Sequence, residues 1–390
     1  MKHKQLVIGI LVTFWLAWAV PNASGAPSLI MHELALALPA WQQANSNGFG
    51  DPLAGEVSAL EAFNGYLYAG IHSDAHDALI YRSPDGVTWT AVIAPGFGIS
   101  HDIAPRAILD FIVFNNKLYT STGRGGDPGQ IYRTLYGAWD TWAPMVIYGF
   151  GDQDNVDITA LGVYNGVIYA GVTNSVTGAQ IWSSPTGDNN TWTQMVAPEL
   201  ADSSITGFAE FDGGLYAAVQ SETGAPAQIW YSYGGDWTVS DSFGDSSTLS
   251  TGGMAVFGGY LYVGAGNTTV GAQLWRTDDG ATWGPVISPA FEAPNNQKVE
   301  AVFVYQNQLY VSVKNAVTGL EVWRSANGSL WEKAHQDDGG FGDSHNTGTN
   351  WGNAVADFGC ALYVGTLNVT DGGELWRMRQ SCLYLPLIRR

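Results

Sequence analysis

Short apolar strands separated by turn residues recur along nearly the whole chain. In each copy an aromatic residue precedes a two-residue turn, and an aliphatic-Tyr strand follows, as in Phe63-Asn64-Gly65-Tyr66-Leu67-Tyr68. The seven tyrosines that end these copies are Tyr68, Tyr119, Tyr169, Tyr216, Tyr262, Tyr310 and Tyr363. Turns of the Asn-Gly, Asp-Gly or Gly-Gly type suit a type I′ hairpin, because both central residues need a positive φ. The pattern therefore predicts seven β-hairpins, spaced about 50 residues apart.

Two further strands complete each copy. About a dozen residues after each tyrosine comes an aliphatic-aromatic pair, as in Ile80-Tyr81 and Leu274-Trp275. In six copies another tryptophan follows: Trp89, Trp142, Trp192, Trp237, Trp283 and Trp331. Repeated four-stranded units of this length are typical of a β-propeller, in which neighbouring blades bury each other's apolar faces. We therefore predict an all-β, seven-bladed β-propeller of four-stranded antiparallel blades; the competing β-solenoid has shorter repeats without a hairpin in each.

The seventh outer strand is predicted at the start of the propeller. Trp41 precedes Phe49 by eight residues, the same spacing as from Trp89 to Phe97, and a Gly-Phe-Gly segment recurs at both places. Residues 39–45 should therefore complete the last blade, so that the N-terminal strand closes the ring and removes its open edges. The tail around Tyr384 is the alternative source of this strand. Pro386 argues against it, because proline cannot donate to a ladder.

The two ends of the chain indicate export. Lys2 and Lys4, an apolar run and the small residues that end at Ala26 have the order of a signal peptide, predicted over residues 1–26. An uncleaved anchor is the alternative, although the apolar run is short for a bilayer span. We expect no membrane span after cleavage, and a secreted, extracellular or cell-surface protein. The propeller is expected over residues 27–380, followed by a C-terminal tail at 381–390.

The only two cysteines, Cys360 and Cys382, predict one disulfide bond, since disulfides persist in exported proteins. It would close a loop of about twenty residues and pin the tail. Two free buried thiols are the alternative.

Composition narrows the function further. The 390 residues include 49 glycines, and 16 Lys and Arg stand against 35 Asp and Glu, for a net charge of −19. This charge excludes nucleic-acid binding by counterion release, because no basic face can be assembled. The 16 Trp, 18 Tyr and 15 Phe exclude a disordered chain. Only 13% of residues are charged, and the glycine-rich hairpin repeats account for this low fraction, so it does not indicate a membrane protein. We expect a monomer.

The turns after two of the third strands carry a known pattern. Ser83-Pro84-Asp85-Gly86-Val87-Thr88-Trp89 and Thr277-Asp278-Asp279-Gly280-Ala281-Thr282-Trp283 resemble the Asp-box, or bacterial neuraminidase repeat, of sialidases and other secreted propellers. The resemblance implies a sialidase-like fold, with these turns on the face opposite the ligand site. In such a motif the Asp and Ser or Thr cap a tight turn while the Trp packs between strands. The residues that this interpretation makes structural are Ser83, Asp85, Gly86, Trp89, Thr277, Asp279, Gly280 and Trp283.

Sialidase activity does not follow from this resemblance. The family clamps its substrate's carboxylate with three arginines, whereas most arginines here repeat at one third-strand position and are expected to belong to the scaffold. The arginines at this position are Arg82, Arg133, Arg276, Arg324 and Arg377. Only Arg106 and Arg124 are placed to reach the opposite face, and two arginines cannot make the triad. The catalytic residues therefore stay unassigned.

The loops that join the blades offer candidate ligand contacts. A Gly-Phe-Gly-Asp segment recurs in them, and its aspartate is more often a turn residue than a catalyst. An acidic rim that binds Ca²⁺ or a polyhydroxy ligand is the functional interpretation. The candidate rim residues are Asp51, Asp102, Arg106, Arg124, Asp152, Asp245, Glu292 and Asp343.

Two loop groups could hold a metal. Asp152 and Asp154 begin a segment with closely spaced oxygen ligands, similar to a calcium loop but without its glycine and distal glutamate. His72, His76 and His101 come from adjacent loops and, with a carboxylate, could bind a transition metal; the alternative is solvated loop histidines.

These observations favour a non-enzymatic propeller that binds glycans or cell-surface proteins through its loop-rich rim, with calcium as the one cofactor suggested. The alternative is a carbohydrate-active enzyme, a glycoside hydrolase or sialidase-like protein, that uses two rim carboxylates about 5–9 Å apart.

Overall fold

The computed structural model describes residues 40–379, apart from 102, 126–127, 197–202, 222–223, 241–242, 288–290, 292, 336–338 and 350–352. The described residues belong to one compact unit, Pro39–Arg390. The predicted signal peptide, the tail at 381–390 and Cys382 lie outside the described residues.

The described residues fold almost entirely into β-strands. One sheet contains β1 (Trp41–Gln43), β26 (Val355–Phe358), β27 (Ala361–Gly365) and β28 (Leu375–Arg379). The next contains β2 (Glu56–Phe63), β3 (Tyr66–His72), β4 (Leu79–Ser83), β5 (Thr90–Ala91), β6 (Ala107–Phe114), β7 (Lys117–Gly123), β8 (Ile131–Thr134) and β9 (Ala143–Val146). Four more sheets follow: β10 (Asn155–Tyr164), β11 (Val167–Asn174), β12 (Gly178–Ser184) and β13 (Thr193–Val196); β14 (Ser203–Phe211), β15 (Gly214–Ser221), β16 (Gln228–Ser232) and β17 (Thr238–Ser240); β18 (Thr248–Phe257), β19 (Tyr260–Asn267), β20 (Gly271–Thr277) and β21 (Gly284–Ile287); β22 (Asn296–Tyr305), β23 (Gln308–Asn315), β24 (Glu321–Ser325) and β25 (Glu332–Lys333). Among the described residues, single helical turns precede the strands β2, β6, β10 and β26: η1 (Asn47–Gly50), η2 (Pro95–Gly98), α1 (Tyr148–Gly151) and η4 (Gly340–Gly342).

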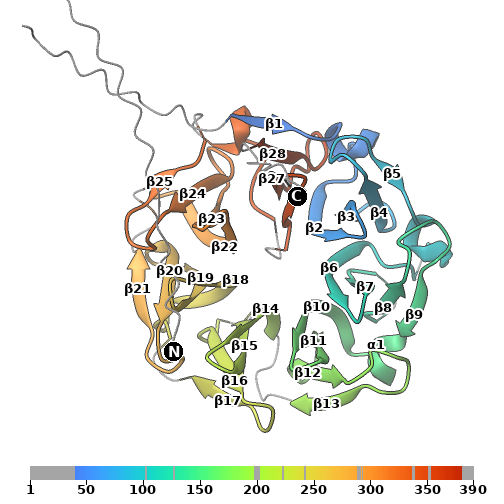
Figure 1. The fold of residues 1–390 in the computed structure, drawn as a ribbon, viewed down its shortest axis with the longest axis horizontal. Helices are drawn as coiled ribbons and strands as arrows, with labels where there is room; N and C mark the ends of the chain where they lie inside the picture. Colours follow the sequence, from blue (N-terminus) through green and yellow to red (C-terminus); the bar gives the residue numbers. More distant parts are fainter. Residues whose placement is uncertain are drawn as a thin grey trace, which may run out of the picture. The chain divides into compact units, whose positions relative to one another are not determined.

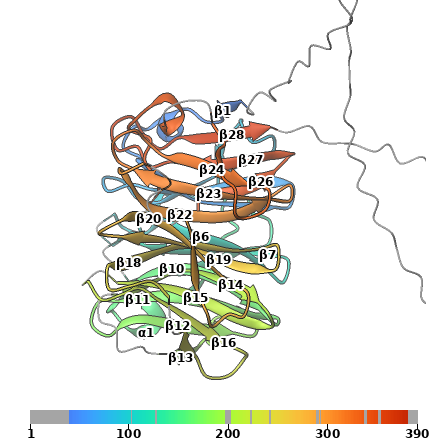
Figure 2. The same cartoon turned by 90° about the vertical axis from the view of Figure 1, so that its left-hand side faces the viewer.

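The strands form antiparallel meanders arranged around a common axis (Figure 1), with the first strand of each meander innermost. From the side, the strands run between the two faces of this arrangement (Figure 2). A single residue pair, His72 with Ala107, joins β3 to β6 and so makes one eight-stranded sheet of β2–β9. The N-terminal strand β1 pairs with β28, with Trp41 opposite Met378. The all-β class and the four-stranded antiparallel sheets are confirmed.

The hairpin turns have the backbone that their residues predict. Asn64 and Gly65, between β2 and β3, have φ values of 49° and 78°. Cys360 occupies the corresponding turn before β27 with a φ of 63°. A β-carbon is unfavourable there, so this turn is a strained place for a cysteine.

Buried tyrosines join several neighbouring sheets. Tyr363 in β27 is only 2% exposed, and its hydroxyl lies against Gly86, where a β-carbon would come within 1.8 Å of the tyrosine oxygen. Tyr216 meets Gly280 in the same way, also at 1.8 Å. Glycine is therefore required in these turns by a neighbouring sheet as well as by its own φ of 73–74°.

The phenylalanine of each Gly-Phe-Gly segment packs on the outer aromatic residues. Phe341 stacks on Trp376 with ring centroids 4.9 Å apart and lies 5.0 Å from Trp41. Phe49 makes the same two contacts, with Tyr81 and Trp89. The helical turns thus anchor the loops that precede the innermost strands. Within the described part of the chain, no helix is both long enough and apolar enough to cross a membrane.

Candidate functional site at the centre of one face

Two kinds of loop define the two faces. Because each meander is antiparallel, the hairpin turns after the first strands and the turns after the third strands lie at one end of every sheet. The loops before the first strands and those after the second strands lie at the other end. We call the end with the loops before the first strands and after the second strands the upper face. The opposite end is the lower face.

The Asp-box-like turns on the lower face use their polar groups internally. Asp85 Oδ1 accepts hydrogen bonds from the backbone N–H groups of Val87, at 2.9 Å, and Thr88, at 2.7 Å. These backbone hydrogen bonds, that from Thr88 first, hold the pKa of Asp85 well below its usual range. Asp279 repeats this arrangement with Ala281 and Thr282.

The tryptophans that end these turns also bond within the scaffold. Trp89 Nε1 donates to the carbonyl of Ala44, and Trp283 Nε1 donates to Ser240 Oγ. The Asp85, Asp279, Trp89 and Trp283 side chains therefore make their hydrogen bonds within the scaffold.

The third-strand arginines also have scaffold contacts. Arg82 donates to the carbonyl of Gly137 and lies 4.5 Å from the centre of the Tyr66 ring. Arg276 lies 4.3 Å from the centre of the Tyr260 ring. The guanidinium groups of Arg82 and Arg276 therefore pack on tyrosine rings of the hairpins.

The repeated rim aspartates fix their loops. Asp152 accepts hydrogen bonds from the N–H of Asp154 and from Asn174 Nδ2, both at 3.0 Å. Asp245 accepts from the N–H of Ser247, at 2.8 Å, and from Asn267 Nδ2, at 2.9 Å. The hydrogen bonds explain why the aspartate recurs.

The other rim candidates have different surroundings. Asp51 accepts from the N–H of Leu53 and lies 2.6 Å from His76 Nδ1. Asp343 makes the same loop contacts as Asp152 and is described below. Asp102 and Glu292 lie outside the described residues.

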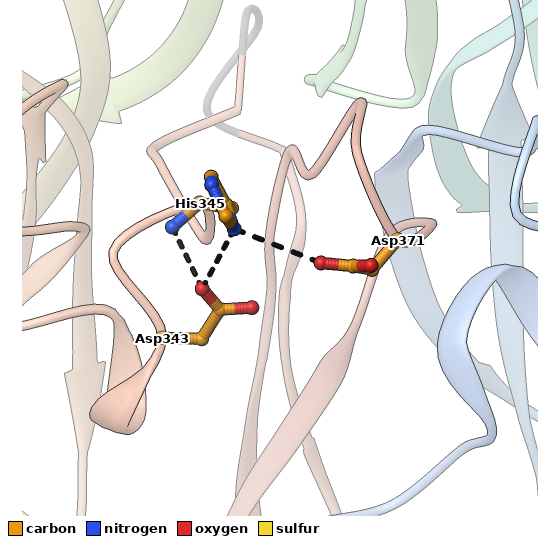
Figure 3. A group of neighbouring side chains, drawn as sticks. All are labelled: Asp343, His345 and Asp371. Atoms are coloured by element: carbon orange, nitrogen blue, oxygen red, sulfur yellow. Dashed lines mark hydrogen bonds and ion pairs between the residues drawn. The ribbon is translucent and has the colours of Figure 1, made fainter.

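The three candidate metal-binding histidines face three different carboxylates. His72 Nδ1 lies 2.8 Å from Glu56, and His101 Nδ1 lies 2.5 Å from Asp77, while His76 is bound to Asp51. The structure does not bring these histidines to one point. Among the described residues, the one group of three metal-ligating side chains whose ligand atoms lie within 4.8 Å of one another is Asp343, His345 and Asp371 (Figure 3).

One register position of the innermost hairpins gathers charge near the axis. Residues opposite each other at the upper ends of the first and second strands are Glu56 with His72, Ala107 with Gly123, Asp157 with Thr173, Ser204 with Gln220, Ser250 with Gly266, and Lys298 with Lys314. We call these six pairs the central ring. Equivalent backbone positions thus carry acids on one side of the axis and two lysines on another.

The acidic side of the central ring is buried and internally paired. Glu56 is fully buried against His72, whose Nε2 lies 3.3 Å from Asp74. Burial lowers the pKa of His72, but the hydrogen bond with Glu56 and the charges of Glu56 and Asp74 outweigh it and raise that pKa overall. Asp157 accepts the backbone N–H of Arg124 at 2.7 Å.

Electrostatic interactions connect these groups. Burial raises the pKa of Asp157, and the charges of Arg124 and His72 oppose that rise. Arg106 lies just before β6, and its guanidinium donates to the carbonyl of Asp74 at 3.3 Å. Both Arg106 and Arg124 thus contact residues at the upper ends of the innermost hairpins.

Glu300 lies beside the two lysines. It is 2% exposed, its Oε1 is 3.8 Å from Lys314 Nζ, and its Oε2 has no hydrogen-bond partner among the described residues. Burial raises the pKa of Glu300 to about 7, against the charges of Lys314 and Lys298, and the charge of Glu56 adds to the rise. The basic and the acidic sides of the ring are thus electrostatically coupled.

An open cleft of about 850 Å³ adjoins the lysines. It lies between the β18–β21 sheet and the β22–β25 sheet, and Lys298, Lys314, Ser250 and Thr268 are among its lining residues. Lys298 Nζ also donates to Gln220 at 3.3 Å, across the small pair Ser250 and Gly266. Small side chains at this ring position leave room beside the cations.

Sequence reasoning missed Glu56, Glu300, Lys298 and Lys314. Comparing equivalent positions could have found Glu300, because it occupies the bulge of a first strand. The corresponding bulge residues elsewhere are Ser58, Leu109, Thr159 and Thr206. The bulge of β18 holds Gly252 and Gly253. Glu300 is therefore the charged residue at a position where the other described copies carry glycine, leucine or a hydroxyl side chain.

Comparisons with known proteins show the fold. No family model matches the chain, and no curated protein matches its sequence. Among solved structures, YCF48 from Cyanidioschyzon merolae is 12% identical with a TM-score of 0.56, over 87% of this chain and 98% of that one. The extracellular domain of a hybrid two-component system from B. thetaiotaomicron is 14% identical with a TM-score of 0.58, over 87% of this chain but only 40% of that one. A sialidase from Trypanosoma rangeli also matches, at 13% identity and a TM-score of 0.46, over 93% of this chain and 56% of that one.

The protein is a β-propeller, as the repeat pattern predicted. At these identities the likeness shows the fold and leaves the ligand open.

Proposed function

We propose that the protein is a secreted or cell-surface propeller that binds an acidic carbohydrate in the cleft between the β18–β21 and β22–β25 sheets. The observation that carries this proposal is the pair Lys298 and Lys314, which stand opposite each other and line that cleft. Like charges directly opposite each other destabilise an antiparallel pair. Glu300 lies 3.8 Å from Lys314 and compensates part of this repulsion. A bound anion in the cleft would interact favourably with both lysines.

The charge distribution of the whole chain supports an anionic ligand. The described upper-face bases, Arg106, Arg124, Lys298 and Lys314, all lie at or beside the central ring of a chain with a net charge of −19. A local cationic site on an acidic protein focuses binding on that one place. Hydroxyl groups such as those of Ser250 and Thr268 suit a polyhydroxy ligand, because polar groups orient ligands in an open cleft.

A carbohydrate-active enzyme is the second candidate, and Glu300 is the observation that favours it. Burial raises the pKa of the Glu300 carboxyl to about 7, near the carboxylate of Glu56, and a raised pKa is what the general acid of a glycoside hydrolase needs. In this case Glu300→Gln would abolish hydrolysis while binding persists.

The test is a glycan array of neutral, carboxylated and sulfated saccharides, probed with residues 27–390. Binding to the acidic saccharides should fall at least tenfold in the Lys298→Gln/Lys314→Gln double variant. Lys333→Gln is the control, because Lys333 lies on β25 of the same sheet and pairs with Glu321. A preference for neutral glycans, or for a protein partner, would contradict the proposal. So would equal binding by the double variant.

We further propose a complete architecture of seven blades closed by the N-terminal strand. Two features support it: one residue pair alone joins β3 to β6, and β1 pairs with β28. Tyr363 and Gly86 also bring the last sheet against the first one. We retain the signal peptide at 1–26, the propeller at 27–380 with residues 39–45 in the last blade, and the monomeric state as proposals.

The disulfide between Cys360 and Cys382 remains part of this proposal. No described cysteine is free, and Cys360 occupies a turn whose positive φ gives cysteine no conformational advantage. A covalent partner in the tail is the reason we infer for a cysteine there.

A further inference from the structure

We propose that Asp343, His345 and Asp371 form a binding site for a divalent first-row transition metal such as Zn²⁺. His345 Nδ1 lies 3.2 Å from Asp343 Oδ1 and 3.6 Å from Asp371 Oδ2. Ligand atoms about 2.0–2.1 Å from a tetrahedral zinc ion are roughly 3.3 Å apart. The three side chains point toward one another from two loops (Figure 3). The two distances from His345 are close to that spacing, and all three ligand atoms lie within 4.8 Å of one another.

Asn368, which is fully buried, connects the two loops that carry the aspartates. Its Nδ2 donates to Asp343 Oδ2 at 3.2 Å, and its Oδ1 accepts the backbone N–H of Asp371 at 2.9 Å. Asp343 Oδ1 also accepts the N–H of His345 at 2.9 Å. Such outer hydrogen bonds orient metal ligands and limit the reorganisation that binding requires. The Asp343 carboxylate and the backbone at His345 and Asp371 are therefore fixed by these hydrogen bonds.

Other sheets provide an internal comparison. Asn267 bonds Asp245 and the N–H of Val270 in the same way, and Ser247 stands where His345 stands. The β18–β21 sheet therefore has the same hydrogen-bonded loop arrangement as the last sheet. Its two variable positions, however, carry Ser247 and Val270. In the last sheet both positions carry metal-ligating side chains, so this group is a departure from the repeat.

The mixture of ligands selects the class of metal. One imidazole and two carboxylates suit Zn²⁺ or Mn²⁺, whereas Ca²⁺ takes six to eight oxygen ligands. The side chains of His345 and Asp371 are 56% and 50% exposed, so a water molecule or a ligand hydroxyl can complete the coordination. The site does not depend on the proposed carbohydrate cleft, and either can fail alone.

The experiment is isothermal titration of metal-free residues 27–390 with Zn²⁺, Mn²⁺ and Ca²⁺. We expect one equivalent of Zn²⁺ to bind, and His345→Gln or Asp371→Asn to weaken binding at least about tenfold, the lower end of what disturbing a metal's surroundings costs. His76→Gln is the matched control, since His76 is an exposed loop histidine paired with one rim aspartate, Asp51. It should leave zinc binding unchanged.

Two results would overturn the metal site. One is the absence of stoichiometric zinc binding. The other is zinc binding that survives His345→Gln and Asp371→Asn but falls in His76→Gln. Circular dichroism of each variant shows whether a loss reflects unfolding.

Discussion

Replacing Gly86 by alanine tests the contact between the first and last sheets. Two costs add at this position. The φ of 74° is unfavourable for a residue with a β-carbon by about 1 kcal/mol. The new β-carbon would also lie 1.8 Å from the Tyr363 hydroxyl oxygen and 2.6 Å from the adjacent ring carbon, so the buried tyrosine must move. Disturbing the packing of a large buried aromatic residue costs about 2–4 kcal/mol more.

We therefore expect Gly86→Ala to lower the free energy of unfolding by about 3–5 kcal/mol, measured by guanidinium denaturation. The matched control is Gly65→Ala, where φ is 78° but nothing lies within 4 Å of the new β-carbon. That variant should lose only about 1 kcal/mol. Gly280→Ala should match Gly86→Ala, because Tyr216 approaches it equally closely. The reasoning fails if Gly86→Ala is no worse than Gly65→Ala, and the closed ring fails if Gly86→Ala is much milder than Gly280→Ala.

Three further predictions concern pH, the tail and the loop anchors. Burial raises the pKa of Asp110 to about 8 and that of Glu61 to about 7. The stability that these neutral acids contribute is therefore complete below about pH 4 and is lost as pH rises through 7–8. Asp110→Asn should flatten the fall in melting temperature over this range, and an unchanged slope would contradict the assignment. Cys382→Ser should lower the free energy of unfolding by about 3 kcal/mol under non-reducing conditions and by nothing extra after reduction; two thiols titrating in the denatured, unreduced protein would disprove the disulfide. Phe341→Ala should lower the free energy of unfolding by about 3–5 kcal/mol, because the Phe341 ring packs on both Trp376 and Trp41. The control Val304→Ala, at a 44% exposed strand position, should lower it by less than about 1 kcal/mol. Similar losses in both variants would mean that Phe341 does not anchor its loop.

The fold was predictable because its signals are local and repeated. Positive φ at Asn64 and Gly65, the wedge position of Phe49 and the outer tryptophans follow from residue chemistry, and each recurs often enough to outweigh a single ambiguous copy. The outer position of Trp41 also came from spacing alone, and in the structure that strand pairs with β28.

The site was less predictable, because its residues meet through the ring and not along the chain. Glu300 and Glu56 are 244 positions apart, yet each raises the electrostatic energy of the other. Rim aspartates such as Asp152 were candidate ligand contacts because they repeat. In the structure, hydrogen bonds within their own loops account for the repetition. Repetition indicates scaffold here, whereas residues that break the repeat, such as Lys314, mark the candidate site.

The same logic allows the metal site to be copied into another sheet. Asp245 and Asn267 already hold the β18–β21 loops as Asp343 and Asn368 hold those of the last sheet. Ser247→His with Val270→Asp would then supply the two missing ligands on an existing scaffold. We expect this double variant to bind two equivalents of Zn²⁺, and each single variant to bind one with high affinity, since two ligands alone make a weak site. Should the double variant still bind one equivalent while keeping its fold, the Asn-centred scaffold would not be sufficient to build the site, and the ligand spacing around His345 would depend on features of the last sheet alone.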